Sequence, residues 1–391
     1  MTDINVKVEA GFGHTILDAS PTWTDITTKL VEGRISRGRD SVDQRFETGT
    51  GHLILDNRDG RFTRTNTSGT YYPNVKLGVP IRITATINDS TVVYPIFYGE
   101  ARGWPGQYFA GAEYAETEVI LADGFYTLNQ EDLAGFSYDT HRTDERIDAV
   151  LDDINWPDEL RDLDTGLANV QAKEFAAPGD GSSYPALSHL LDVAESEAGV
   201  LFMSSDGKVT FRNRIALAAG SAVATYDGTD DYMDIEPKDD DDVFYNVIRI
   251  AREDGAQIEF DGSGSGPRRV LARDVMPMNT DTEARSVAEW LYGLFGENRL
   301  RIDGLKFKPR RDATLAAELL GLELRDIITI QFDPPGSGDT FNEDCVVEKI
   351  EHQFRPKDWT TILSVAPITA LEAGPFFTLD ASTLDGTDIL A

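Results

Sequence analysis

The sequence predicts a mainly β protein, with two β-barrel domains and a small α+β domain between them. Residues 1–130 hold short β-branched or aromatic runs bounded by Gly, Pro, Asn or Asp, which is typical of strands. Two stretches with helical periodicity follow in 131–224, and strand patterning returns in 225–370. We therefore expect an N-terminal β-barrel at 1–130, an α+β insert at 131–224, a second β-barrel with one helix at 225–370, and a C-terminal docking tail at 371–391.

The first domain is expected to contain six strands. Six short strands in one unit favour a barrel or sandwich, because closure limits the number of exposed edges. The predicted strands are 4–8, 27–35, 52–55, 80–87, 92–99 and 116–121.

The stretch GHLILDNRDGRF at 51–62 predicts a tight β-hairpin in this domain. Its first half is a short apolar strand, and its middle, Asp56–Gly60, contains the Asn, Asp and Gly residues that tolerate positive φ. The acids of this turn also suggest a calcium loop, but the ligand spacing and the distal Glu of an EF-hand are missing. A turn is the favoured interpretation.

The insert is expected to contain two amphipathic helices and a hairpin. Thr143 is a predicted N-cap for a helix over 144–154, and Gly199 is expected to follow a helix over 184–198. A turn at 204–207 then joins two short strands. The apolar helix faces comprise Ile147, Val150, Leu151 and Ile154, and Leu187, Leu190, Leu191, Ala194 and Ala198.

The C-terminal domain begins with an acidic segment, 225–242, which carries nine acids and one Lys and predicts a solvated connector. A helix over 280–297 is expected among strands at 244–251, 301–310, 326–332, 345–354 and 360–365, with a helical turn near 315–320.

The chain is strongly acidic. Its 391 residues include 36 basic and 68 acidic ones, for a formal charge of −32. Such a surface repels phosphate backbones and anionic membranes, so specific nucleic-acid binding and membrane adsorption are disfavoured. No signal peptide or membrane span is recognisable, which predicts synthesis in a cytoplasm. Cys345 is the single cysteine, in a strand-like context that favours a buried, inert thiol.

The sequence offers no catalytic residue, no cofactor motif and no metal site. The five His residues are scattered without HxxxH or HExxH spacing, and Ser188 and His189 are adjacent on a helix and point in different directions. The glycine-rich loop 262–266 lacks the GK[ST] of a phosphate loop. The acidic run 239–242 is compatible with weak calcium binding, although a solvated connector is favoured. Paired carboxylates of the glycosidase type stay open, because acids are abundant throughout the chain.

One basic cluster and the apolar tail are the candidate interaction sites. Lys306, Lys308 and Arg310 share one face of the predicted strand 301–310, opposite Leu305 and Phe307. In a chain this acidic we favour a contact with another subunit over a nucleic-acid patch, with a plain solvated face as the alternative. An apolar tail beyond a domain is expected to dock on its own chain or a neighbour. Its candidate contact residues are Phe376, Phe377 and Leu384.

Spaced residues along most of the chain form a further pattern. They are Trp23 to Ile26, Gly33-Arg34, Arg37-Gly-Arg39, Leu55 to Phe62, Asn66, Tyr71-Tyr-Pro73, Gly78 to Ile83, Phe97 to Glu100, Trp104, Leu187 to Phe211, and FFTLDASTLDGTDIL at the end. This pattern resembles the minor tail proteins of long-tailed phages (siphoviruses) of actinobacteria. The order of barrel, α+β insert and barrel is similar to the baseplate hub, or tail-tip hub, proteins.

The resemblance implies a structural role in the virion and a protein that is not an enzyme. Hub proteins have two tail-tube-like β-barrels and form homotrimers that present a pseudo-sixfold ring around the DNA channel at the tail tip. The implied partners are the distal tail protein and tail tube, the tape measure protein, and tip or receptor-binding proteins. DNA passes through the lumen without specific binding. The alternatives are a distal tail protein in a hexameric ring, and a tail-associated carbohydrate-binding or cell-wall-degrading protein.

Overall fold

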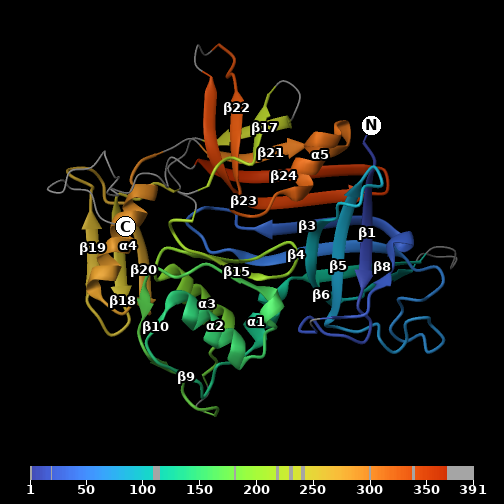
Figure 1. The fold of residues 1–391 in the computed structure, drawn as a ribbon, viewed down its shortest axis with the longest axis horizontal. Helices are drawn as coiled ribbons and strands as arrows, with labels where there is room; N and C mark the ends of the chain where they lie inside the picture. Colours follow the sequence, from blue (N-terminus) through green and yellow to red (C-terminus); the bar gives the residue numbers. More distant parts are fainter. Residues whose placement is uncertain are drawn as a thin grey trace.

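A computed structural model describes residues 2–18, 20–108, 115–179, 182–216, 220–228, 232–238, 243–298, 301–336 and 340–367. Most of its strands belong to one 14-stranded sheet, whose main path runs β17-β21-β24-β23-β3-β4-β8-β6-β5-β1-β2. Figure 1 shows this sheet beside a helical layer and a smaller sheet. The prediction of a mainly β fold with an α+β insert is confirmed.

The first β unit is antiparallel throughout and its core side is almost fully apolar. Leu53, Leu55, Ile81, Ile83 and Val119 alternate with more exposed residues along their strands and are completely buried. The strands are β1 (Ile4–Ala10), β2 (Thr24–Asp25), β3 (Leu30–Gly38), β4 (Glu47–Asp56), β5 (Val79–Ile87), β6 (Tyr94–Gly103), β7 (Gly106–Tyr108) and β8 (Ala115–Ala122), with a 3₁₀ turn at Thr27–Lys29.

The predicted hairpin at 51–62 is wrong. β4 ends at Asp56, and the chain then passes through successive turns until β5 begins at Val79. The buried side chain of Asn57 explains this path. Its amide donates to Thr63 and Thr117 at 3.0 and 2.8 Å, and its oxygen accepts from the N–H of Phe62 at 3.0 Å. These bonds stabilise a loop at the position where the second strand of the hairpin was predicted.

The insert contains the two predicted helices, and their buried faces match the predicted periodicity. The first begins one residue earlier than expected, with Arg142 as the N-cap, because the hydroxyl of Thr143 donates instead to the carbonyl of Ala168. The elements are α1 (Gly124–Gln130), α2 (Thr143–Asp153), α3 (Ala186–Glu195), β9 (Ser137–Tyr138), β10 (His141–Arg142), β11 (Arg161–Leu163), β12 (Asn169–Val170), β13 (Lys173–Glu174), β14 (Val200–Met203), β15 (Val209–Arg212) and a 3₁₀ turn at Asp158–Leu160.

The second β unit extends the main sheet. The connector predicted at 225–242 is wrong for its described part, because β16 pairs in parallel with β22, and β17 pairs with β21. Residues 239–242 lie outside the described residues. The elements are β16 (Ala224–Asp227), β17 (Tyr232–Lys238), β21 (Arg301–Phe307), α5 (Ala313–Gly321), β22 (Ile327–Phe332), β23 (Phe341–Arg355), β24 (Asp358–Pro367) and a 3₁₀ turn at Pro309–Arg311.

A separate unit interrupts the second β unit. It consists of β18 (Val247–Arg252), β19 (Gln257–Asp261), β20 (Val270–Met276) and α4 (Asp281–Phe295), and its three strands form a sheet of their own. Ile248, Ile250, Val287 and Phe295 belong to its own apolar core. In Figure 1 it stands beside the insert, apart from the main sheet. The sequence predicts these residues as part of the second barrel, whereas in the structure they form a separate unit with its own sheet.

The two β units join edge to edge. β3 pairs antiparallel with β23 from Gly33 opposite Phe354 to Gly38 opposite Lys349. The residues on one face of this junction, such as Ile35 and Ile350, are buried. The opposite face carries charged side chains and is the first of the candidate sites.

Candidate functional sites: a polar sheet face and a central cavity

A polar sheet face covers the junction of the two β units. It is formed by Glu32, Arg34, His52, Glu118, Glu351 and Arg355, on β3, β4, β8 and β23. Its polar contacts run between neighbouring strands: Arg34 lies 3.0 Å from Glu351 and Arg355 lies 2.5 Å from Glu32, as ion pairs, and the ring of His52 is hydrogen-bonded to Glu118 at 2.7 Å. Exposed pairs of this kind stabilise a fold by only about 0–1 kcal/mol each. These pairs therefore contribute little to the stability of the fold, and the face is suited to contact with solvent or a charged partner.

The predicted basic cluster begins on β21, between β17 and β24, and continues into the 3₁₀ turn that follows. Lys306 is exposed on β21, opposite Ile362. Lys308 bonds Asp358 at 2.9 Å, and Arg310 bonds Asp3 at 2.7 Å. The structure thus gives two of the three cations acidic partners within the chain, and their contact with another subunit stays a prediction.

The structure does not describe the apolar residues of the tail that were predicted as contacts. Phe376, Phe377 and Leu384 lie outside the described residues.

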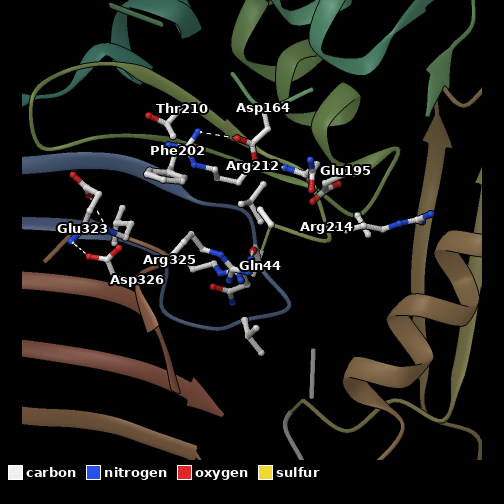
Figure 2. Close-up of a pocket in the computed structure, with 18 of the residues that line it drawn as sticks. Gln44, Asp164, Glu195, Phe202, Thr210, Arg212, Arg214, Glu323, Arg325 and Asp326 are labelled. Atoms are coloured by element: carbon white, nitrogen blue, oxygen red, sulfur yellow. Dashed lines mark hydrogen bonds and ion pairs between the residues drawn. The ribbon is translucent and has the colours of Figure 1, made fainter. Parts of the chain in front are cut away.

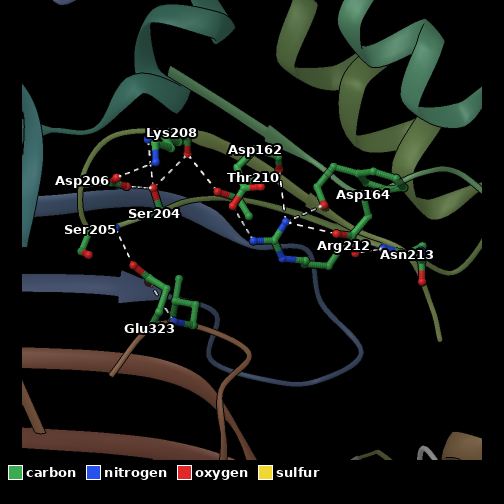
Figure 3. Close-up of polar contacts among 12 residues, drawn as sticks. Asp162, Asp164, Ser204, Ser205, Asp206, Lys208, Thr210, Arg212, Asn213 and Glu323 are labelled. Atoms are coloured by element: carbon green, nitrogen blue, oxygen red, sulfur yellow. Dashed lines mark hydrogen bonds and ion pairs between the residues drawn. The ribbon is translucent and has the colours of Figure 1, made fainter. Parts of the chain in front are cut away.

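A buried ion pair connects three parts of the chain. Arg37 on β3 is 3% exposed, and its guanidinium donates to Glu323 at 2.6 Å and to the carbonyl of Met203 at 3.4 Å. Glu323, which follows α5, also accepts the N–H of Ser205 at 2.7 Å (Figure 3). The first β unit, the β14–β15 turn of the insert and the second β unit therefore meet in one polar contact.

A second buried cluster contains Arg39 and Arg325, which lie two residues after Arg37 and Glu323, respectively. Glu348 on β23 accepts from Arg39 and from Arg325, each at 2.6 Å. Two cations thus share one carboxylate, and burial lowers the pKa of Arg325 to about 10. Nε of Arg325 has no hydrogen-bond partner. Gly38 permits this arrangement, because at its φ of +120° a Cβ would lie 2.2 Å from the carbonyl oxygen of Glu348.

A cavity of about 590 Å³ opens where these units meet. Figure 2 shows Arg325 and Gln44 on one side and Arg212 on another, while Arg214 extends toward α4. Val42, Leu291, Leu294 and Phe295 form an apolar part of the lining. The walls come from the β3–β4 loop, the β14–β15 hairpin, α4 and the α5–β22 turn.

Several acids also line the cavity, and most of them have partners. Arg212 lies 2.5 Å from Asp162 and 3.4 Å from Asp164 (Figure 3). Lys208 pairs with Asp206 at 3.0 Å. The lining is therefore a mixture of paired charges and apolar side chains, with no arrangement of nucleophile and base.

Burial shifts the pKa of several titratable groups in the core. Burial lowers the pKa of His189 and of His352 to about 3, so both rings are neutral. Cys345 is buried, as predicted, and burial raises the pKa of its thiol to about 12. Asp123 accepts the N–H groups of Gly49 and Phe125 at 2.7 and 3.0 Å, and burial raises its pKa to about 7. It caps α1 where the first β unit meets the insert.

Within the described ranges, no three His, Cys, Asp or Glu side chains converge in a way that could hold a metal ion. None of the helices described is long and apolar enough to cross a membrane.

Comparison of the fold with solved structures gives a consistent result. A 43 kDa tail protein of prophage MuSo2 from Shewanella oneidensis superimposes with a TM-score of 0.60 at 11% identity, covering 94% of this chain and 99% of that one. A tail protein from Neisseria meningitidis gives a TM-score of 0.59 at 9% identity with the same coverage. The fold is that of phage tail proteins.

A third match extends this tail-protein fold to secretion machinery. An Escherichia coli component of the type VI secretion system, described as similar to the T4 tail proteins gp27 and gp5, has a TM-score of 0.51 at 8% identity. It covers 87% of this chain and 73% of its own. No family model and no curated protein matches the sequence.

Sequence reasoning missed the buried charges of the tail-protein fold. Arg37, Arg39 and Glu348 belong to strands and turns where a charge ordinarily indicates an exposed position. One signal was present, because Arg37-Gly-Arg39 is among the spaced residues that resemble phage minor tail proteins. The structure gives that triplet a physical role at the junction of the β units.

Proposed function

We propose that this chain is a structural hub of a siphovirus tail tip, assembled as a homotrimeric ring around the DNA channel. The observation that carries the proposal is the β3–β23 pairing, which joins two β units of one chain into a single sheet. A subunit with two β units can supply two of six positions in a ring, so three copies match a sixfold tube. The tail-protein fold over 94% of the chain supports this assignment.

The polar sheet face is our candidate for the channel wall. Its two arginines are each paired with a carboxylate, so the face offers DNA few unpaired cations. A wall of this kind lets a polyanion pass without specific binding. The remaining surfaces of the ring would contact the distal tail protein and tail tube, the tape measure protein, and tip or receptor-binding proteins.

Imaging and mass measurement test this proposal. We expect cryo-electron microscopy of the parent virion to place the chain at the distal end of the tail, and mass photometry of the purified protein to give a trimer. A location in the capsid would overturn the proposal. A hexamer would instead indicate the distal tail protein.

Zymography on host cell wall tests the non-enzymatic role. We expect no clearing by the purified chain. Clearing would favour a tail-associated wall-degrading protein.

A further inference from the structure

The loop between β4 and β5, residues 57–78, differs in charge from the rest of this acidic chain. Residues 58–78 contain three Arg, one Lys and one Asp, a net charge of +3. Because the whole chain carries −32, all other residues together carry −32 − 3 = −35. A local excess of cations in such a chain marks a surface suited to a negatively charged partner.

The loop has a defined conformation. Its backbone forms five successive turns, each closed by an N–H that donates to the carbonyl three residues earlier at 2.9–3.2 Å. The donors are Gly60, Thr63, Asn66, Gly69 and Tyr72. The buried amide of Asn57 ties the start of the loop to Thr117 on β8. The loop therefore presents its side chains from a fixed backbone.

Aromatic side chains anchor the inner side of the loop. The ring of Tyr71 stacks on that of Phe12, with centroids 4.3 Å apart. Phe62 is 1% exposed and stacks on Trp104 at 6.0 Å, and Nε1 of Trp104 donates to the carbonyl of Lys76 at 2.8 Å. Since the loop is ordered before any partner arrives, binding costs it little conformational entropy.

The outer side of the loop combines apolar and cationic side chains. Tyr72 is 46% exposed and Leu77 is 51% exposed. Arg64 and Lys76 are exposed, and no hydrogen bond or ion pair joins either side chain to another residue of the described ranges. In Figure 1 the loop lies on the side of the first β unit away from α4. Exposed apolar groups beside unpaired cations favour contact with an acidic protein surface.

Charge also decides which surfaces can meet. Two copies that each carry −32 repel one another, so they associate where local charges are complementary. The loop meets this condition against the acidic remainder of a second copy. It does not meet it against the same loop, because two cationic loops repel. The contact is therefore between different surfaces of two copies, which generates a ring or a filament and not a twofold dimer.

We propose that loop 57–78 is one side of a head-to-tail contact between copies of this chain. Arg64 and Lys76 pair with carboxylates of the neighbouring copy, and Tyr72 and Leu77 pack at the centre of the contact. This inference rests on the assembly of copies in the proposed hub, and it names a surface through which the ring closes.

Zero-length cross-linking with a carbodiimide tests the contact in the full-length protein. Copies with natural and with heavy nitrogen are mixed, so that mass spectrometry separates links between chains from links within one chain. We expect Lys76 to be joined to an Asp or Glu of another copy, at least tenfold more often than Lys357, an exposed lysine of the β23–β24 turn. Links of Lys76 only within its own chain, or equal frequencies for the two lysines, would overturn the proposal.

Charge reversal provides a second test. We expect Arg64→Glu/Lys76→Glu to raise the dissociation constant of the oligomer at least tenfold in sedimentation at roughly 0.15 M salt. Tyr72→Ser/Leu77→Ser is expected to have a similar effect. Arg285→Glu/Lys357→Glu is the matched control, because it makes the same charge change at exposed residues on α4 and the β23–β24 turn. An equal effect in the control would overturn the proposal, while circular dichroism verifies that each variant is folded.

The outcomes separate this contact from the hub assignment. A trimer that persists in Arg64→Glu/Lys76→Glu would overturn the loop contact and leave the hub proposal standing, and a monomeric parent protein would also overturn the contact. A virion location away from the tail tip would overturn the hub alone. If the variant kept its oligomer but lost binding to a labelled DNA duplex in fluorescence anisotropy, the loop would bind nucleic acid instead.

Discussion

Arg37 and Glu323 lie 2.6 Å apart although 286 positions separate them in the sequence. Arg37 is buried on β3, and Glu323 precedes β22, so this pair ties the N-terminal half of the chain to the C-terminal half. Because Glu323 also accepts the N–H of Ser205, the same pair fixes the β14–β15 turn.

Removal of this pair by Arg37→Ala is expected to lower the free energy of unfolding by about 1.5–3 kcal/mol, because Glu323 and the carbonyl of Met203 both lose a charged donor. Chemical denaturation gives the value. Arg34→Ala is the matched control on the same strand, since the Arg34 side chain is 60% exposed and pairs with Glu351 at the surface. We expect about 0–1 kcal/mol for the control. Equal effects in the two variants would contradict a special role for Arg37.

Gly38→Ala is expected to destabilise the fold by at least about 2 kcal/mol. The added Cβ would lie 2.2 Å from the carbonyl oxygen of Glu348, at a φ of +120° that side chains rarely adopt. Gly179→Ala separates the two causes, because Gly179 has a φ of +109° with nothing within 4 Å of its Cβ position. Thermal unfolding of both variants measures the difference. If Gly179→Ala were the more damaging, steric contact with β23 would not be the cause.

The stability of the protein is expected to depend on Asp123 between pH about 4 and about 7. Burial raises the pKa of this carboxyl to about 7, above its ordinary value of 3.8. In this interval the folded state holds a proton that the unfolded state has lost, so the free energy of unfolding falls as pH rises, with a slope approaching about 1.4 kcal/mol per pH unit from this group.

Denaturation at several pH values measures that slope. Asp123→Asn keeps an acceptor for the N–H of Phe125 and removes the charge. We expect the variant to have a smaller slope than the parent protein. An identical slope in both would assign the pH dependence to other carboxyls.

Asn57→Ala is expected to cost about 2–3 kcal/mol, because Thr63, Thr117 and the N–H of Phe62 all lose a partner in a buried site. Asn66→Ala in the same loop is the control, since its amide donates to the carbonyl of Gly60 and its site is only part-buried. We expect about 1 kcal/mol for that variant. Hydrogen exchange of residues 57–78 would report whether the loss is local.

Lys306→Glu is expected to weaken assembly without loss of folding. Lys306 is exposed, whereas Lys308 and Arg310 have acidic partners in their own chain, so reversal of those two would also disturb the fold. Sedimentation at low salt measures the oligomer. An intact oligomer with Lys306→Glu would reject this residue as part of a subunit contact.

The parts of the fold that were predictable depend on local patterns. α2 and α3 follow from residues three and four positions apart, and the alternation of Leu305 and Phe307 with Lys306 is visible in the sequence. The unit of β18–β20 and α4 was not separable, because strand patterning does not identify pairing partners. The loop after Asp56 was mispredicted because a single side chain, that of Asn57, replaces a ladder of backbone bonds.

The candidate sites also divide into residues that local sequence patterns predict and residues that only distant contacts bring together. Lys306 and the tail residues are predictions from composition and charge. Arg37, Glu348 and the cavity depend on contacts between residues roughly 150 to 300 positions apart, which no local pattern encodes.

The β3–β23 junction also determines when the molecule can fold. Glu32 and Arg355, which pair across it, are 323 positions apart, so β3 lacks its β23 partner until β23 has left the ribosome. During synthesis its open edge exposes unpaired backbone groups that are able to pair with another chain. A nascent chain is therefore vulnerable to premature association until β23 has been made. Completion of β23 closes that edge.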